Sequence, residues 1–266
     1  MCWSGQASAT LATIGTVTTL YAAWKGEPKP LWIALGYFTM MEWLQAVTYS
    51  GIGQCFAPSN QIATLLGYLH VAFQPFFINA LCLYFVPKRV AEKAAPWAYA
   101  FCFFSAIFMI LQLYPFPWAG HCDPRSTLCS DRLCSVRGNW HIAWEVPVNG
   151  IGNSFTGWPV HGMPTYAIAA FVIPLLYGSW KMVIYHLVLG PWLSHALTNN
   201  LNEWPAVWCL LSIGILVLVV KTPVRQYMYV DKWWLWRKDP DRIAVQDKPP
   251  AAEPAAAILE VSPVRE

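Results

Sequence analysis

The chain has 266 residues, of which 56% are hydrophobic, 15% aromatic and only 12% charged. A soluble domain carries about 25% charged residues, so this composition argues against an ordinary water-soluble domain and indicates a chain solvated by lipid. The formal net charge of +3 comes from basic residues at the ends of apolar segments and in the C-terminal tail, which indicates lipid contact and orientation and not nucleic-acid binding.

Seven apolar segments follow one another along the chain. A hydrocarbon core of about 30 Å requires about 20 apolar residues in a helix, where each backbone polar group finds its partner inside the segment. The segments that meet this need are residues 7–24, 31–50, 62–86, 96–115, 160–178, 181–198 and 204–220. The sequence therefore predicts an all-α fold, a polytopic bundle of seven transmembrane helices over residues 1–220.

The basic residues give this bundle an orientation. Alternate connectors and the C-terminal tail, which would share the inner side, hold 14 of the 17 Lys and Arg. The other three are Arg125, Arg132 and Arg137. Lys and Arg concentrate on the cytoplasmic side of membrane proteins. We therefore expect an N-terminus outside, a C-terminus inside and a multi-pass protein of the plasma (inner) membrane, with no cleaved signal peptide because residues 1–9 carry no Lys or Arg.

The connector between the fifth and sixth segments is very short. Residues 178–181 leave room only for a tight hairpin. Pro164, Pro174 and Pro191 in these segments allow kinks or a re-entrant piece instead, and a lost span here would invert the C-terminus.

Residues 116–159 form the one long connector, and we expect them to fold into an extracytoplasmic cap. Connectors of this length are usually functional or folded. The cysteines outside the apolar segments all fall on the predicted outer side, where disulfides form. They are Cys2, Cys55, Cys122, Cys129 and Cys134. Five is an odd number, so at least one thiol stays free, binds metal or pairs elsewhere, and the spacing does not give the connectivity.

Two different segments follow the last apolar segment. Aromatic residues interleave with Lys and Arg over residues 221–238, which predicts a helix at the inner membrane interface. Residues 239–266 are rich in Pro, Ala and charge, which predicts a disordered cytoplasmic tail.

Glu42 is the only acidic residue within the seven segments, which contain no internal Lys or Arg. A carboxyl group at that depth is costly and by default marks a functional site. Gln45 and Tyr49 follow at i+3 and i+7, so the three side chains share one helical face.

Histidines supply further candidates in the outer half. His70 with Gln74, and His195 with Asn199, are i, i+4 pairs on the third and sixth segments. Imidazole and carboxylate are common ligands of divalent metals, so Glu42, His70 and His195 form a candidate metal site in a polar cavity that opens outward. Glu42 or His70 would act as ligand or general base, with Gln45, Gln74 and Asn199 as contacts to a bound cofactor or ligand.

Structural roles for these residues remain open. An intramembrane histidine can serve helix packing, and Gln45, Gln74 and Asn199 can be packing or supporting groups. His121 and His141 in the long connector are interpreted as ordinary loop histidines. The seventh segment lacks a lysine, so a retinal Schiff base has no attachment point.

The chain resembles an uncharacterised family of small multi-pass membrane proteins. The residues that carry the resemblance are Met-Cys-Trp-Ser at residues 1–4, Met-Glu-Trp-Leu-Gln at 41–45, the run from Leu66 to Asn79, and Glu-Trp-Pro at 203–205. The resemblance extends from Met1 to about Val220. It implies one continuous membrane domain and transfers no catalytic residue, because the family has no assigned activity.

Three classes of function stay open at this point. The first is a membrane protein that binds a metal ion or small ligand in its outer-half cavity, as in a metal-dependent membrane enzyme. The second is a proton- or cation-coupled transporter in which Glu42 exchanges the ion. The third is a sensor or assembly subunit without chemistry of its own. The expected partners are the lipid bilayer and a small or lipid-like ligand, the metal and substrate are unassigned, and the oligomeric state is open.

Overall fold

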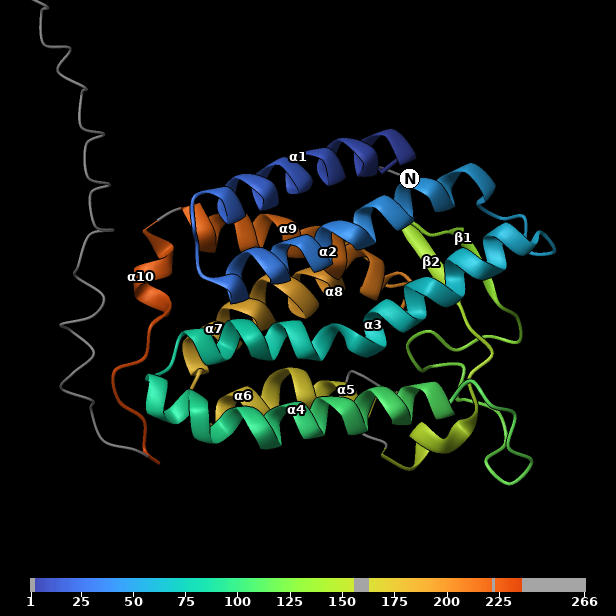
Figure 1. Cartoon of the computed structure of the whole chain (residues 1–266). Coiled ribbons are helices and arrows are strands. Elements are labelled where there is room, and N and C mark those ends of the chain that lie inside the picture. Colours follow the sequence, from blue (N-terminus) through green and yellow to red (C-terminus); the bar gives the residue numbers. More distant parts are fainter. Residues whose placement is uncertain (1–2, 156–162, 222, 236–266) are drawn as a thin grey trace, which may run out of the picture.

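The computed structural model describes residues 3–155, 163–221 and 223–235, and nearly all the regular structure in them is helical. The long helices lie side by side along one axis (Figure 1). In chain order the helices are α1 (Gly5–Trp24), α2 (Lys29–Thr48), α3 (Pro58–Tyr84), α4 (Lys88–Leu111), α5 (Pro164–Ala167), α6 (Ile173–Leu176), α7 (Trp180–Leu187), α8 (Leu193–Leu197), α9 (Trp204–Lys221) and α10 (Val224–Met228). The predicted all-α class is confirmed.

Two of the helical rods contain a π-helical turn. Residues Ile168–Val172 join α5 to α6, and Val188–Trp192 join α7 to α8. A π turn lies next to Pro174 and another contains Pro191, because a proline has no N–H to donate to the carbonyl four residues back. The described residues therefore form seven rods at the positions of the seven predicted segments, with the predicted tight hairpin at Gly178, whose φ is +99°.

Fewer helices qualify as membrane spans than the sequence predicted. Among the described helices, α3 and α4 are long and apolar enough to cross a membrane, by length and composition. Polar residues such as Thr10, Lys29 and Glu42 lower the hydropathy of α1 and α2, and the described apolar stretches Pro164–Leu176 and Trp204–Gly214 are shorter. The structure thus supports a helical bundle with two candidate spans and leaves seven spans and the orientation of the termini unsupported.

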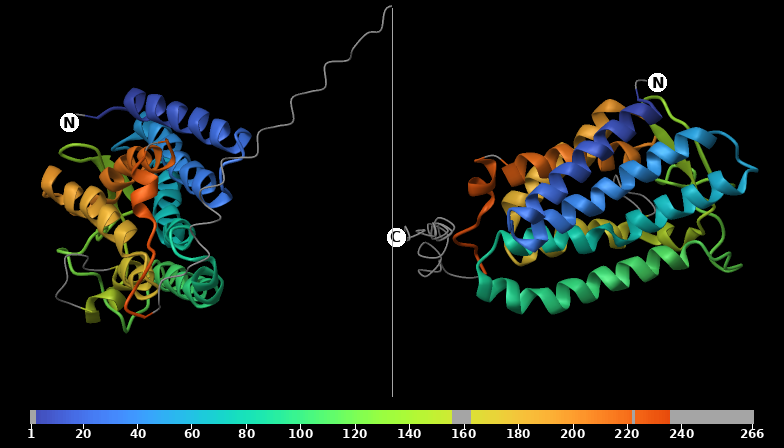
Figure 2. Two further views of the ribbon diagram at one scale, coloured as in Figure 1. Left: turned by 90° about the vertical axis from the view of Figure 1, so that its left-hand side faces the viewer. Right: turned by 45° about the horizontal axis from the view of Figure 1, so that its top comes forward.

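Helix α2 is at the centre of the bundle. It packs against α1, α3 and α9, while α4 packs on the other side of α3. The view along the bundle in Figure 2 shows these helices around one another, with α1 and α4 on opposite sides. Fully buried apolar side chains on α2, including Leu31, Leu35, Phe38 and Met41, form part of the core.

Residues 112–155 fold over one end of the bundle (Figure 1), and we call this segment the cap. Two antiparallel strands, β1 (Cys134–Arg137) and β2 (Ile142–Glu145), form its centre, and the 3₁₀ helix Gly150–Phe155 follows. Figure 1 shows this cap beside the turn between α2 and α3. Predicted disulfides are confirmed as Cys55–Cys134 and Cys122–Cys129, and the first ties the cap to that turn. Cys2 lies outside the described residues.

The chain after α9 crosses the opposite end of the bundle. Arg225 forms an ion pair with Glu27 at 2.6 Å and donates to the Tyr84 hydroxyl, and the Val230 N–H donates to the Phe85 carbonyl. The interfacial helix predicted over 221–238 is helical only at Val224–Met228 in the described part beyond α9, because Tyr229 and Val230 are tied to α3 in an extended conformation. The predicted tail, 239–266, lies outside the described residues.

Candidate functional site

The Glu42 carboxyl group lies inside the bundle without a hydrogen-bond partner. Its side chain is fully buried, and neither carboxylate oxygen makes a well-formed hydrogen bond. Ser8 of α1 lies close enough to interact with it. The Ser8 hydroxyl itself accepts a hydrogen bond of 2.8 Å from Trp3 Nε1. Glu42 is therefore a polar group buried between α1 and α2, without contact to solvent.

One helical turn further along α2, Gln45 connects this region to the cap. Gln45 Oε1 lies 2.7 Å from His141 Nε2, and the Tyr49 hydroxyl lies 2.7 Å from His141 Nδ1. An amide oxygen only accepts, so the consistent assignment places the proton on Nε2 and lets Tyr49 donate to Nδ1. Burial lowers the pKa of His141 to about 3, so this imidazole is neutral. Gln45 Nε2 has no partner.

A second buried carboxylate, Glu203, holds the cap above this cluster. It accepts hydrogen bonds from the backbone N–H groups of Asn139, Trp140 and His141 and from the Thr198 hydroxyl, with lengths of 3.0 Å from Asn139 and 2.6 Å from Thr198. A side chain at Gly138 would meet Glu203, because an added Cβ would lie 2.6 Å from its Cδ. Glu203 therefore fixes the loop that carries His141.

On the other side of Glu42, a chain of polar side chains joins α3, α5 and α9. The Tyr166 hydroxyl donates to Gln74 Oε1 at 2.7 Å, and Gln74 Nε2 lies 3.8 Å from Cys209 Sγ. The Cys209 thiol is within electrostatic range of the Glu42 carboxyl group. Gln74 is thus a member of the buried polar interior and is not paired with His70.

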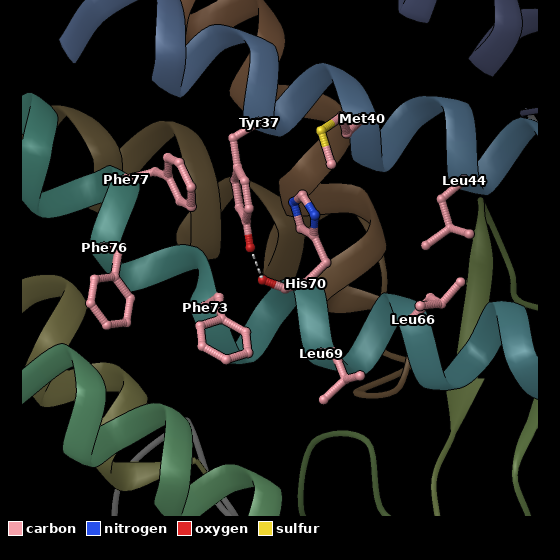
Figure 3. A pocket seen from close by; sticks show the side chains of 9 residues that line it. All are labelled: Tyr37, Met40, Leu44, Leu66, Leu69, His70, Phe73, Phe76 and Phe77. Atoms are coloured by element: carbon pink, nitrogen blue, oxygen red, sulfur yellow. Dashed lines mark hydrogen bonds between the residues drawn. The ribbon is translucent and has the colours of Figure 1, made fainter. Parts of the chain in front are cut away.

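His70 lies in a different place, at an apolar groove between α2 and α3 (Figure 3). Its ring stacks on Tyr37 with the centroids 3.9 Å apart, and Tyr37 stacks on Phe77 at 3.6 Å. The Tyr37 hydroxyl donates to the His70 backbone carbonyl, while His70 Nε2 is buried without a partner. The groove has a volume of about 720 Å³ and is lined by Tyr37, Met40, Leu44, Leu66, Leu69, His70, Phe73, Phe76 and Phe77.

Glu42 faces away from this groove. Met40 and Leu44 line the groove and are each two residues from Glu42, which at about 100° per residue places Glu42 on the far face of α2. His195 on α8 and Asn199 after it are exposed, and the His195 ring lies against Trp204 with the centroids 4.8 Å apart. The structure therefore gives Glu42, His70 and His195 three separate environments.

One group of potential metal ligands does meet within the described residues. Its members are His121, Cys122 and Cys129 in the cap, and it includes none of the three predicted ligands. The sequence analysis also missed His141 and Glu203 as buried polar groups. His141 sits in a run of Trp and apolar residues, and Glu203 directly precedes an apolar segment, so their neighbours were the available signals of burial.

Together these features define a helical bundle with two candidate membrane spans, a disulfide-linked cap at one end and an unpartnered buried carboxyl group beneath it. The chain belongs to a family of unknown function, DUF5765, whose model matches residues 6–229. The resemblance to an uncharacterised family is thereby confirmed. The searches of curated proteins and of solved structures give no match.

Proposed function

We propose that this protein is a multi-pass membrane protein that binds a proton or a small cation at Glu42. In this proposal all seven rods cross the membrane, with the cap outside and the C-terminal segment inside. Helices α1 and α2 have 20 residues each, which at about 1.5 Å per residue matches a hydrocarbon core of about 30 Å. Helix α2 packs directly on the candidate span α3, and α1 packs on α2.

The observation that carries the proposal is the state of the Glu42 carboxyl group. An ionised carboxylate without hydrogen bonds or a counter-charge costs several kcal/mol or more to bury. The Glu42 side chain is fully buried and neither oxygen makes a well-formed hydrogen bond; the Ser8 hydroxyl beside it carries no charge to balance an ionised carboxylate. A bound proton or cation removes that cost, so the site has a physical reason to take up positive charge.

Hydrogen-bonded side chains connect the cap with the neighbourhood of Glu42. Tyr49, His141 and Gln45 form a hydrogen-bonded series that ends one helical turn from Glu42. Deeper in the bundle, Cys209, Gln74 and Tyr166 continue the polar series from the other side of Glu42. This arrangement favours a role for Glu42 in the interior of the bundle over a role at its surface.

The geometry favours this function over a metal-dependent enzyme built on the predicted ligands. A tetrahedral metal with bonds of about 2 Å needs its ligand atoms within about 3 to 4 Å of one another. Glu42 lies on the face of α2 that points away from the groove, and His70 lies at the groove. His195 is exposed and lies against Trp204. These three side chains do not form a ligand group among the described residues.

The test measures binding to purified full-length protein in detergent micelles. Thermal melting is followed by tryptophan fluorescence with Na⁺, K⁺, Mg²⁺, Ca²⁺ or ammonium added at constant ionic strength. We expect at least one cation to raise the melting temperature of wild type and to have no such effect on Glu42→Gln. Proton binding is measured separately, as a carboxyl band in the infrared spectrum that Glu42→Gln removes.

Glu92→Gln is the matched control, because Glu92 on α4 is an exposed carboxylate paired with Lys88 at 3.8 Å. It should respond to cations as wild type does. The proposal fails if no cation distinguishes wild type from Glu42→Gln and if the infrared spectrum shows no protonated carboxyl group that depends on Glu42.

A second candidate function, binding of a lipid acyl chain, is favoured by the groove between α2 and α3. Its lining is apolar except for His70 and the Tyr37 hydroxyl. In a protein that crosses the membrane, an open apolar groove on candidate span α3 would contact lipid tails. A photo-activatable fatty acid should label wild type in the groove and should label Leu69→Trp much less, whereas equal labelling would exclude this use of the groove.

A further inference from the structure

We propose that Trp3 is a positioning residue for Glu42: its indole N–H fixes the Ser8 hydroxyl so that the hydroxyl hydrogen points at the protonated Glu42 carboxyl group. The inference rests on the proposed function, because it concerns how the same site holds its proton. Trp3 precedes α1, so the inference adds a residue outside the helices to the site and links the site to the cap.

The packing of α1 against α2 places Ser8 near Glu42. The two helices are antiparallel, and α1 begins at the cap end of the bundle (Figure 1). A Cβ on Gly5 would lie 2.8 Å from Tyr49 Cβ. Ser8 follows Gly5 by three residues, so it lies level with a point three residues before Tyr49, which is about one helical turn from Glu42. Ser8 and Glu42 are both fully buried, and their side chains interact.

The Ser8 hydroxyl has a single hydrogen, and its other possible uses are absent. Trp3 Nε1 donates to Ser8 Oγ at 2.8 Å, so the hydroxyl is the acceptor in that bond. A serine in a helix often donates to the carbonyl four residues back. Thr10 and Thr13 of α1 do so, at 2.9 and 2.8 Å, whereas Ser8 makes no such bond in the described structure. Its hydrogen is therefore available to Glu42.

The cap holds Trp3 in place. The Trp3 backbone N–H donates to the Trp140 carbonyl at 3.2 Å, and the two indole rings stack with their centroids 6.0 Å apart. The Trp3 ring also lies against His141, with the centroids 5.9 Å apart. Glu203 accepts hydrogen bonds from the backbone N–H groups of Trp140 and His141. The indole N–H of Trp3 thus has a defined direction, and a shift of this loop would reach Ser8 through Trp3.

This arrangement favours a hydrogen bond that Glu42 needs. Neither oxygen of Glu42 makes a well-formed hydrogen bond in the described part of the chain. A protonated carboxyl group keeps an oxygen that accepts hydrogen bonds, and a buried acceptor without a partner is costly. A small rotation of either side chain brings the Ser8 hydrogen into line with this oxygen. Because Trp3 donates to Ser8, that hydrogen does not turn toward the indole.

The test follows the C=O stretch of Glu42 by infrared spectroscopy on the full chain in detergent, without added metal cations. The band is assigned as the one that Glu42→Gln removes. Trp3→Phe keeps an aromatic ring against the cap and deletes the indole N–H, whereas Ser8→Ala deletes the hydroxyl. A carbonyl group that loses a hydrogen-bond donor absorbs at higher wavenumber, so we expect both substitutions to shift the band upward.

The double variant Trp3→Phe/Ser8→Ala should shift the band no further than Ser8→Ala does, because Trp3 acts through Ser8. Trp43→Phe is the matched control. Trp43 Nε1 donates to Thr16 Oγ1 at 3.0 Å, so this substitution also removes a bond between an indole and a hydroxyl of α1. It should leave the Glu42 band in place. Circular dichroism confirms that each variant is folded.

The inference is overturned if the Glu42 band is present and Trp3→Phe leaves it unmoved, if Trp43→Phe moves it as far, or if the shifts in the double variant add. It is also overturned if wild type shows no Glu42 band while a cation still raises its melting temperature through Glu42. In that case the proposed function stands without it. Absence of both the band and the cation effect would remove the proposed function as well.

Discussion

Three titratable side chains are buried in or beneath the cap, and their polar groups are hydrogen-bonded to different extents. Glu203 is surrounded by hydrogen-bond donors, three of them backbone N–H groups. His141 is neutral and is satisfied by Tyr49 and Gln45. Glu42 has only the neighbouring Ser8 hydroxyl and no well-formed hydrogen bond. A buried polar group without a partner is costly, so of the three only Glu42 calls for an additional ligand.

The neutral state of His141 predicts a loss of stability in acid. The pKa of His141 is lowered to about 3 in the folded protein, so below its unfolded value of about 6.5 the unfolded chain binds a proton that the folded protein does not. Stability should therefore fall as the pH drops from about 6.5 toward 3, by up to about 1.4 kcal/mol per pH unit. Melting temperature measured against pH tests this slope.

His141→Gln should have a shallower acid slope than wild type, even if its stability at neutral pH is lower. His121→Gln serves as the control, because that side chain is 49% exposed. If the melting temperatures of wild type and His141→Gln fall equally with pH across this range, His141 is not a buried, neutral imidazole.

At the scale of the elements, close contact between α1 and α2 depends on a glycine. A Cβ on Gly15 would lie 2.4 Å from Thr39 Oγ1 and 3.0 Å from Thr39 Cγ2. Thr39 cannot turn away cheaply, because its hydroxyl donates to the Leu35 carbonyl at 2.7 Å and its side chain is buried. The two helices can approach only where one of them lacks a side chain, as small residues allow in membrane bundles.

Gly15→Ala should therefore destabilise the protein. Overpacking in a close contact costs about 1 to 3 kcal/mol, which outweighs the gain of about 0.5 to 1 kcal/mol from alanine in a helix. The measurement is the melting temperature in detergent. Gly214→Ala on α9 is the matched control, because an added Cβ there meets nothing within 4 Å, and it should be neutral or stabilising. Equal effects of the two substitutions would contradict the packing argument.

At the scale of the whole molecule, the two ends of the bundle differ in chemistry. The disulfides and both strands lie at one end, whereas α10 and the Arg225–Glu27 ion pair lie at the other (Figure 1). Lys88 and Lys93 at the start of α4 share the second end. This separation agrees with an oxidising outer side and a basic inner side.

Labelling of single introduced cysteines in intact cells distinguishes seven spans from two. With α3 and α4 as the only spans, Lys25→Cys and Phe56→Cys would lie on the same side of the membrane. With seven spans, a membrane-impermeant maleimide should label Phe56→Cys in intact cells and Lys25→Cys only after permeabilisation. Both positions are exposed, and Phe56 is 98% exposed, so access to the side chain is not limiting. Labelling of both in intact cells would exclude the seven-span arrangement.

The positions of the helical rods follow from local features, which is why they were predictable. Apolar run length, the prolines and Gly178 act within a few residues of where they occur, and they place the rods and the hairpin. The disulfides were expected from the position of the cysteines, but their pairing depends on how residues up to 79 apart meet. Only the folded chain supplies that information.

The contacts within the site depend on how each helix is rotated about its own axis and on where the cap crosses the bundle. Neither of these follows from the local sequence. Glu42 was identified as the costly carboxyl group from its position within an apolar segment, and the structure buries it fully. Its neighbours were decided by tertiary structure, because the packing of α2 turns Glu42 toward α1 while Tyr37 and Met40 face His70 on α3. In the same way, the cap brings His141 back to Gln45 across 96 residues, a contact that no spacing within a helix encodes.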